Sequence, residues 1–500
     1  MPEAITHHLP ALQIVLTLVA APLCALVGSR WAWAIATAAS ILAFAIAIAL
    51  FGSVIEGTVI SYHMGGWAPP LGIEYRVDIL NAFVLLIVSG IAVITLFYAQ
   101  KSVSAEIGSE KHGLFYAAFL LCLTGLMGVT ITGDAFNVFV FLEISSLSAY
   151  ALIATGADRD RRALTAAYNY LIMGTIGATF FVIGLGLLYM LTGTLNMADL
   201  AQRLFDHGDN RVLRTGFCFV LVGLTLKLAM FTLHLWLPDA YSRAPSAVTA
   251  FLSATGTKVM VYVLLRFLFT IFSFSFAFEG SVLRVIVLPL AMIGIVVASV
   301  VAIFQDDIKR LLAYSSIAQI GYMLLGLALV SQTGVMASII HLFNHAVTKA
   351  ALFMAVGCFV LRAGTTSIHE LRGIGRDMPW TKAAFVVGGL SLIGVPLTVG
   401  FISKWYLVEA FIEEGWWPVA LLIVGSSLLS FAYVWRIIEA AYLREAPEGV
   451  VRKEAPLSML IPTWGLAGLS LFFGMDSSLT SAAASRAANA LISASNLFWQ

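Results

Sequence analysis

The stretch LVGLTLKLAMFTLHLWLPDAYSRAPSAVTAFL, Leu221–Leu252, places a lysine and a proline inside a long apolar run. Such a run is long enough to cross a bilayer core of about 30 Å as a helix. Pro238 lacks a backbone N–H and its ring clashes with the preceding turn, so the helix must break. Non-helical backbone at membrane depth is tolerated only where protein or a water-filled cavity covers it. The stretch therefore predicts an interrupted membrane helix with Lys227 in a covered interior.

The composition predicts an all-α integral membrane protein. Hydrophobic residues make up 60% of the 500 residues, charged residues 11%, and mean hydropathy is +0.95. Soluble domains are nearer about 45–50% apolar and about 25% charged. The apolar runs are too long for outer-membrane strands, which alternate over roughly ten residues. Net charge of +1 predicts no nucleic-acid partner, and four cysteines without a CxxC pattern indicate neither disulfides nor an iron–sulfur cluster.

Hydropathy predicts 14 transmembrane helices, and the N-terminus lacks the basic region of a cleaved signal peptide. A surface hairpin is expected at 52–77 and an interfacial helix in the tail after 475. The predicted spans lie near 10–28, 31–51, 78–99, 113–132, 135–156, 163–192, 212–237, 246–274, 282–304, 309–330, 334–361, 383–408, 416–440 and 456–475. Of the 28 Lys and Arg, four lie within the predicted spans, 17 lie at the loops on one side of the membrane and seven at those on the other side. The positive-inside rule therefore places both termini outside the cytoplasm.

Five ionisable residues lie where an ionised side chain costs about 2.5–3.5 kcal/mol. They are Glu143, Lys227, Lys258, Lys349 and Lys404. Purely structural roles are the alternatives. The glutamate would then form hydrogen bonds with nearby serines, and the lysines would extend to the membrane surface. Because intramembrane charges usually mark ion or proton pathways, we expect a functional role.

The segment HLFNHAVTKAALF, 341–353, adds two titratable groups to the set. His341, His345 and Lys349 are four residues apart and lie near one side of a helix. A HxxxH pair could ligate zinc, but the glutamate of a HExxH site and a third ligand are missing, so no metal is predicted. His234, seven residues after Lys227, is expected on the same helix face and is a possible further member.

A second apolar span is interrupted by Gly394, Pro396 and Gly400 close to Lys404. Paired interrupted spans in corresponding halves indicate a transporter built from inverted repeats. We therefore expect four regions, with Lys227 and Lys404 in matching positions. They are an N-terminal three-helix segment with an extracytoplasmic hairpin (1–112), two inverted repeats (113–274, spans 4–8, and 282–440, spans 9–13) and a C-terminal helix with its tail (441–500).

These residues suit a lateral proton relay. A dry interior disfavours a charged lysine and a nearby carboxylate favours it, so moving the carboxylate switches the lysine between holding and releasing a proton. Histidine titrates near neutral pH and suits a link between lysines. The predicted order is Glu143, Lys227, Lys258, then His345 and His341, then Lys349 and Lys404.

Four motifs make the chain resemble the antiporter-like family shared by Mrp-type multisubunit Na+/H+ antiporters, respiratory complex I and membrane-bound hydrogenases. They are FVFLEISSLSAYALI, LKLAMFTLHLWLPDAYSRAPSAVTAFLSATGTK, HLFNHAVTKAALF and GVPLTVGFISKWYL. The resemblance implies fourteen helices, two inverted five-helix repeats and a proton path through the residues above. Within the family the chain is most similar to the Mrp D subunit. Lys404 disfavours the complex I type that carries glutamate there, and GVPLT departs from the family's usual GxPP.

The function expected from these patterns is a transporter subunit rather than an enzyme, in a bacterial or archaeal cytoplasmic membrane. It would move protons to drive Na+ efflux, with other membrane subunits as partners and no cofactor. The alternative is a proton-pumping subunit of a redox-driven complex, whose redox partners would be other chains. A scaffold whose polar residues only join helices and an intramembrane hydrolase explain the charges less well.

Overall fold

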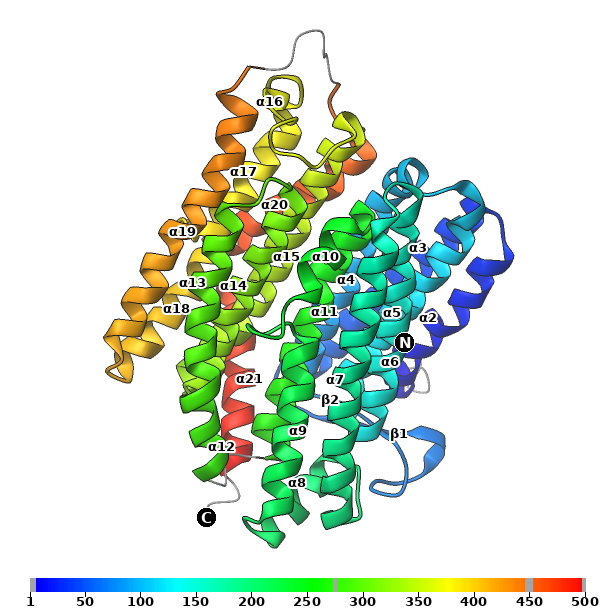
Figure 1. Ribbon diagram of the computed structural model, residues 1–500. Coiled ribbons are helices and arrows are strands. Elements are labelled where there is room, and N and C mark those ends of the chain that lie inside the picture. The colour runs from blue at the N-terminus through cyan, green and yellow to red at the C-terminus, as the bar shows by residue number, and fades with distance from the viewer. Residues whose placement is uncertain (1–5, 273–276, 446–452, 497–500) are drawn as a thin grey trace.

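The computed structural model describes residues 6–272, 277–445 and 453–496, and most of them are helical (Figure 1). Among these residues, 12 helices are long and apolar enough to cross a membrane. Seven of them precede residue 272, and short turns extend three of the seven, α5, α6 and α11. They are α2 (Leu9–Leu26), α3 (Ser29–Val54), α4 (Ile79–Glu106), α5 (His112–Ile131), α6 (Ala135–Ala154), α7 (Arg162–Thr192) and α11 (Ser246–Arg266), which continues as a π-helical turn at Phe267–Ile271.

The other five long helices follow the gap at 273–276. The first begins with α12 (Ala277–Val282) and a π-helical turn at Leu283–Val287. They are α13 (Leu288–Ile303), α14 (Ile308–Ala328), α15 (Gln332–Ala363), α19 (Trp417–Tyr442) and α20 (Leu457–Met475). The all-α membrane architecture is therefore confirmed, whereas the total of fourteen spans and their repeat symmetry stay predictions.

Two predicted spans are interrupted. The span at 212–237 is α9 (Arg211–Lys227), a turn, and α10 (Trp236–Arg243). The span at 383–408 is α17 (Pro379–Ile393), a turn, and α18 (Val399–Glu413), with the four-residue α16 (Ile374–Asp377) before it. Both predicted interruptions are confirmed.

The position expected for the first interruption is wrong. The helix ends at Lys227, and Ala229 adopts a left-handed backbone with φ 62°. Pro238 instead lies in the first turn of α10, where a backbone amide has no helical acceptor to lose. The second interruption lies where the sequence predicts it, because Gly394 ends α17 with φ 91°.

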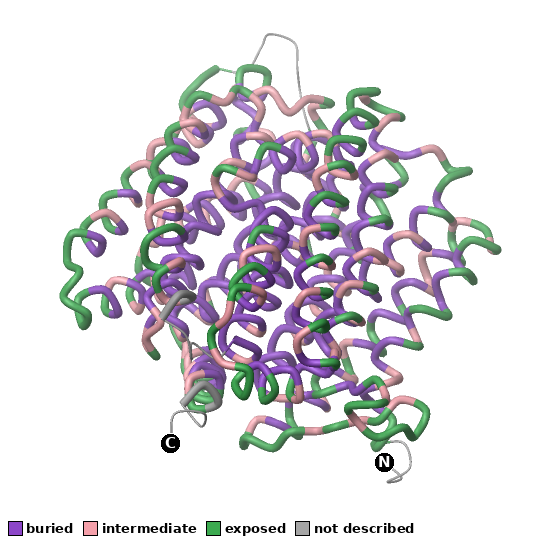
Figure 2. The backbone as a smooth tube through the Cα atoms, turned by 60° about the horizontal axis from the view of Figure 1, so that its bottom comes forward, coloured by how far each residue is buried: buried purple, intermediate pink, exposed green. Residues whose placement is uncertain are grey.

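The polar residues lie inside a bundle whose outer helices face outward with apolar side chains. α11 and α14 are almost wholly buried, whereas α3, α7 and α19 expose much of their length. Figure 2 shows the buried segments in the middle of the bundle and the exposed ones toward its periphery. Leu42, Tyr168 and Leu428 are large exposed apolar residues on those outer helices. α15 lies centrally and contacts α11 and α14, both parts of the second interrupted helix, and α20. A chain in lipid needs this arrangement, because its polar groups must find partners internally.

The predicted hairpin is present. Strands β1 (Ile60–His63) and β2 (Glu74–Val77) pair antiparallel, with Ile60 opposite Val77. The buried Glu74 carboxylate accepts hydrogen bonds from Ser61 at 2.6 Å and from Asn196, which caps α8 (Met197–His207), at 2.9 Å. These contacts attach the hairpin to the helical bundle.

A helix also occupies the tail, where α21 spans Ser478–Asn496. Its small residues Ala484, Ala487 and Ala488 are buried, and it packs on α15 and α4. Its predicted interfacial position stays a prediction.

Candidate functional site

Glu143 and Lys227 form an ion pair inside the bundle. Lys227 Nζ lies 2.9 Å from Glu143 Oε1 on α6 and donates to Ser146 Oγ, one turn further along, also at 2.9 Å. The lysine side chain is 5% exposed and the glutamate side chain 25%. One partner is therefore enclosed while the other reaches the outer surface of this chain.

The interruption after α9 supports the surroundings of Lys227. The amide of Met230 donates to the Thr225 carbonyl at 2.9 Å, and the Trp236 indole donates to the Leu226 carbonyl at 3.1 Å. Both carbonyls belong to the last turn of α9, whose groups have no helical partner. Lys227 thus lies at a helix end that is stabilised by groups from the segment that follows.

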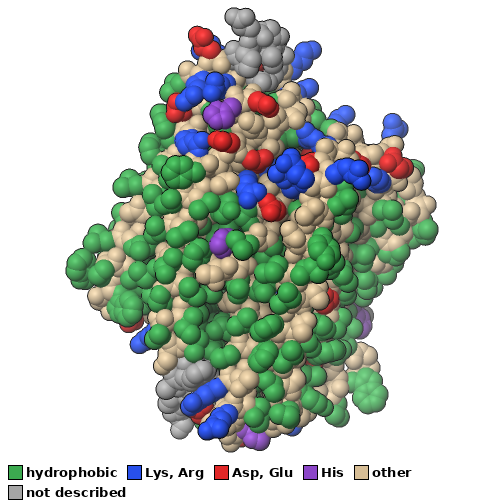
Figure 3. All heavy atoms as spheres, in the orientation of Figure 1, with side chains coloured by type: hydrophobic (Ala, Val, Ile, Leu, Met, Phe, Trp, Pro, Cys, Tyr) green, Lys and Arg blue, Asp and Glu red, His purple; other side chains and the backbone are tan. Residues whose placement is uncertain are grey.

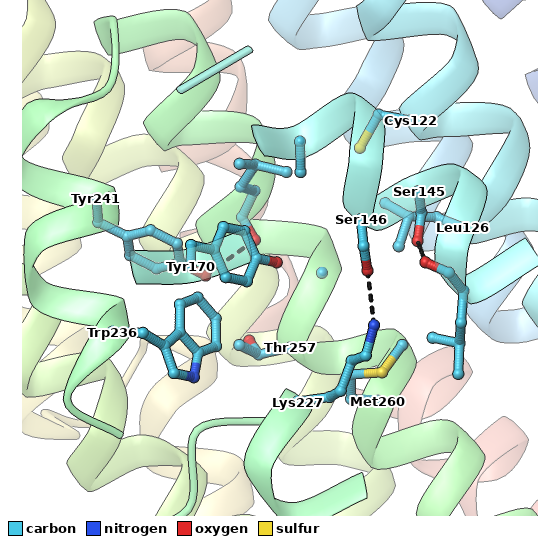
Figure 4. A pocket seen from close by; sticks show the side chains of 14 residues that line it. Cys122, Leu126, Ser145, Ser146, Tyr170, Lys227, Trp236, Tyr241, Thr257 and Met260 are labelled. Atoms are coloured by element: carbon cyan, nitrogen blue, oxygen red, sulfur yellow. Dashed lines mark hydrogen bonds between the residues drawn. The ribbon is translucent and has the colours of Figure 1, made fainter. Parts of the chain in front are cut away.

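A small cavity joins Lys227 to α11. It measures about 30 Å³ and is lined by Lys227, Ser146, Tyr241 and Thr257 among others (Figure 4). This volume accommodates one or two water molecules, which need at least about 10–15 Å³ each. The Thr257 hydroxyl lies 3.4 Å from Lys258 Nζ, which also donates to the Ser253 carbonyl. The cavity therefore leads from the ion pair to the next buried lysine.

The two histidines lie beside each other on α15. Their ring centroids are 6.0 Å apart and the rings are nearly parallel. Within the described part of the chain, neither nitrogen of the His345 ring has a hydrogen-bond partner, although Lys258 and Lys349 lie within range of electrostatic interaction. His341 Nδ1 contacts Ser403 Oγ at 2.8 Å, and its Nε2 is buried without a partner there. Buried polar nitrogens without partners are expected where water completes a path.

Lys404 is held by oxygens at the second interruption rather than by a carboxylate. Its ammonium donates to the Ile393 carbonyl at 2.8 Å, the Leu392 carbonyl at 3.3 Å and Ser427 Oγ at 3.0 Å. The two carbonyls end α17, where the helix dipole carries a partial negative charge. The Tyr322 ring lies 5.0 Å from the ammonium and also contacts the His341 ring edge.

Lys349 lies in a different place from the one expected. Its ammonium donates to the Leu312 carbonyl at 2.7 Å and to Ser315 Oγ, both on α14, and lies 5.9 Å from the Phe353 ring. His341 is the α15 residue on the side of Lys404, because it contacts Ser403 on α18 and shares the Tyr322 ring with Lys404. The expected sequence of contacts, with Lys349 between the histidines and Lys404, therefore differs from the observed one.

His234 does not share a helix face with Lys227, so that expectation is wrong. The helix ends at Lys227, and helical spacing does not apply to the turn that follows. The His234 ring stacks on Phe231 at 5.2 Å and meets Tyr314 of α14 edge-on at 6.4 Å. His234 is buried and its Nδ1 is without a hydrogen-bond partner among the described residues.

The sequence also missed several polar residues beside the charged ones. Ser146 was expected only as a partner of Glu143, but it accepts from Lys227. Thr257, Tyr322 and Ser403, which each contact or lie beside a titratable side chain of the site, were not singled out. Serine and threonine are common in membrane helices, so their presence alone gave no signal; their spacing from the lysines and histidines was the one available indication. Among residues 6–272, 277–445 and 453–496, no group of three or more His, Cys, Asp or Glu side chains is placed to hold a metal ion.

Chemically, the site is a line of proton donors and acceptors across the bundle. A direct contact connects Glu143 to Lys227. At the other end, His341 contacts Ser403, the residue before Lys404 on α18, and the Tyr322 ring lies beside both His341 and the Lys404 ammonium. The cavity beside Thr257 and the unpartnered His345 ring lie between these two ends. Water molecules at these two places would join the ends into one path.

The chain is similar in sequence to a known family of membrane proteins. A family model described as NADH:quinone oxidoreductase/Mrp antiporter, TM matches residues 132–430. The N subunit of the NADH-quinone oxidoreductase of Desulforudis audaxviator is 42% identical over 457 residues, 90% of each chain. The D subunit of the Na(+)/H(+) antiporter of Alkalihalophilus pseudofirmus is 30% identical over 431 residues, 86% of this chain and 85% of the other.

Solved structures show the same fold. A chain in the structure of the Mrp complex from Dietzia sp. DQ12-45-1b superposes with a TM-score of 0.90 at 24% identity, and 100% of this chain and 99% of that chain are covered. The match extends over both interrupted helices and the ends of the bundle.

Proposed function

The chain belongs to the membrane-subunit family shared by NADH:quinone oxidoreductases and Mrp antiporters, and we propose that it translocates protons in a multisubunit Na+/H+ antiporter. The observation that carries the proposal is the Lys227–Glu143 pair at 2.9 Å, next to a cavity that leads toward Lys258. Breaking or forming that pair changes how strongly the enclosed lysine holds its proton. Proton movement in this half would then be coupled to events at the outer surface near Glu143.

The proposed relay runs from Glu143 through Lys227, Lys258 and His345 to His341 and Lys404. Lys349, bound to α14 beside this line, adjusts the charge near His345 and Lys258. His234, which lies close to Tyr314, would be a side branch through which protons enter the relay. Two inverted repeats at 113–274 and 282–440, between the segments 1–112 and 441–500, would place Lys227 and Lys404 in corresponding half-channels.

The test is transport in everted membrane vesicles. Lys227→Ala and Glu143→Ala are each expected to abolish Na+-dependent proton movement while the complex still assembles. If both variants keep that movement at the wild-type rate, the proposed mechanism is wrong. Arg444→Gln, at an exposed ion pair with Glu439 far from the relay, is the matched control.

A second candidate function is the proton-pumping subunit of a redox-driven complex. The 42% identity with an oxidoreductase N subunit, against 30% with an antiporter D subunit, favours it. Co-purification of the chain with iron–sulfur and quinone-reactive subunits would support this alternative. Recovery with small membrane subunits alone, together with Na+-dependent transport, would support the antiporter.

The multi-pass chain is proposed to lie in a prokaryotic cytoplasmic membrane with both termini outside the cytoplasm. The asymmetry of its lysines and arginines supports that orientation. Its partners would be other membrane subunits, protons, Na+ and the surrounding lipid. It would act as a transporter subunit without chemistry of its own.

A further inference from the structure

A second polar cavity lies at the opposite end of α11 from the hairpin side, where the two halves of the chain meet. It measures about 360 Å³. Its walls come from the end of α4, the α6–α7 turn, the α10–α11 turn, the start of α14 and the segment after α15. We call it the arginine pocket, after the cations Arg159, Arg162 and Arg243, which line it with Lys309. Figure 3 shows Lys, Arg, Asp and Glu side chains gathered at this end of the molecule.

The two carboxylates in the arginine pocket are already satisfied. Glu106 accepts from Ser102 Oγ at 2.8 Å and from the Ser246 amide at 3.1 and 3.2 Å, and Arg159 lies 3.5 Å away. Asp160 accepts from Arg162 and from Arg243 Nη1 at 2.9 Å. The hydrogen bonds from Arg162 hold the pKa of Asp160 below its ordinary value, so its charge is present and balanced.

The cations keep donors that no group in the described part of the chain uses. Lys309 is 3% exposed, and its ammonium, with three N–H groups, makes one hydrogen bond to the residues that the structure describes, to the Ala244 carbonyl at 2.9 Å. Each arginine has five N–H groups. Among the described residues, Arg243 makes a single side-chain hydrogen bond, to Asp160. Besides its ion pair with Glu106, Arg159 makes one hydrogen bond to those residues, to the Gly364 carbonyl at 2.9 Å. A buried ammonium with spare donors needs an acceptor within the pocket.

Neighbouring acids do not supply that acceptor. Asp307, the cap of α14, binds the Arg310 amide and Thr366. Asp158 pairs with Lys111, and Asp239 pairs with Arg310 at 2.6 Å. Four cations therefore face two carboxylates inside the pocket, and the surrounding acids are engaged elsewhere.

From this imbalance we propose that the arginine pocket binds a phosphate-type oxyanion, either free phosphate or the headgroup of an anionic lipid. Arginine forms paired hydrogen bonds with phosphate oxygens, and lysine adds a point charge. Arg159, Arg162 and Arg243 belong to the first half of the chain and Lys309 to the second. The bound anion therefore bridges the two halves at their seam.

The test uses the purified complex that contains the full chain, stripped of lipid in detergent. Thermal unfolding is followed with inorganic phosphate and with sodium chloride at matched ionic strength, and retained lipid is counted by native mass spectrometry after adding phosphatidylglycerol or phosphatidylcholine. Arg162→Gln, at a side chain 72% exposed, tests the site without disturbing the fold, and Lys309→Gln tests the buried donor. Arg444→Gln, whose side chain is 49% exposed, is the control.

In Arg162→Gln and in Lys309→Gln, we expect the protection that phosphate gives the complex against thermal unfolding, or the selective retention of phosphatidylglycerol, to fall about tenfold. The control should behave as wild type. Protection by phosphate alone identifies the free anion, and retention of phosphatidylglycerol that phosphate displaces only at high concentration identifies the lipid headgroup. The proposal is overturned if phosphate protects no better than chloride and neither lipid is preferred. It is also overturned if Arg162→Gln binds as wild type does.

Discussion

Lys227 ends α9 at the first helix interruption, and the ammonium of Lys404 reaches the second from within α18, but the two lysines have different partners. Lys227 is paired with a carboxylate, whereas Lys404 is held by two helix-end carbonyls and a hydroxyl. A charged partner can be protonated or moved, while a backbone carbonyl remains in place. The first lysine is therefore the one whose proton affinity an outside event can change, and the second has a fixed environment.

The first prediction concerns the carboxylate. Glu143→Gln keeps the size and hydrogen-bonding capacity of the side chain but removes its charge, so Lys227 loses its only counter-ion among the described contacts. Transport should fall by about 100-fold, the scale of a lost proton-transfer group. Vesicle transport and native gels measure the rate and the assembly of the complex. The double variant with Glu143→Gln and Lys227→Met tests the pairing. If its loss of transport, expressed as free energy, equals the sum of the losses in the two single variants, the residues act separately and do not function as a pair.

A second prediction at this scale concerns Ser403, which the sequence did not single out. Ser403→Ala removes the 2.8 Å contact with His341 Nδ1. Stability should fall by about 1 kcal/mol, and transport should fall several-fold because His341 loses its contact with α18, the helix that carries Lys404. The thermal unfolding of the purified protein and vesicle transport report the two effects. Ser430→Ala, also buried and hydrogen-bonded but on α19, should cost similar stability and leave transport unchanged.

Among the elements, the interrupted helices show what sequence can and cannot predict. Proline and glycine within apolar spans predicted both interruptions, and Gly394 marked the second correctly. The first was misplaced, because Pro238 fits the first turn of α10 and the chain turns at Ala229 instead. A left-handed alanine has no sequence signature, since only its surroundings hold it there.

The turn between α17 and α18 contains a residue with a strained backbone, Leu397. Leu397 has φ 72° and is 65% exposed, so its backbone is strained without burial to offset it. Leu397→Gly should stabilise the protein by up to about 1 kcal/mol, because glycine relieves a left-handed cost of about 1–2 kcal/mol and loses part of that gain in the unfolded chain. Leu397→Val should destabilise it. Thermal unfolding in detergent measures both; equal midpoints for the two variants would contradict the argument.

At the scale of the whole molecule, α15 connects the halves. The sequence correctly placed His341, His345 and Lys349 on one helix but did not predict their neighbours. Each step of four residues turns a helix about 40° past a full circle, so Lys349 is rotated roughly 80° from His341. That rotation directs Lys349 to Leu312 and Ser315 on α14, while His341 reaches Ser403. Spacing alone could not assign these partners, because they depend on how separate helices pack.

The final prediction tests that connection. Lys349→Met removes a buried amino group that acts electrostatically on His345, and it frees the oxygens of Leu312 and Ser315 for water. Proton movement should fall at least about tenfold while native gels show a fully assembled complex, since methionine fills the same space. Lys101→Met, an exposed lysine on α4, is the control and should transport normally. If Lys349→Met keeps more than half of the wild-type transport, Lys349 does not adjust the relay beside it, and its contacts with α14 serve only to hold the two helices together.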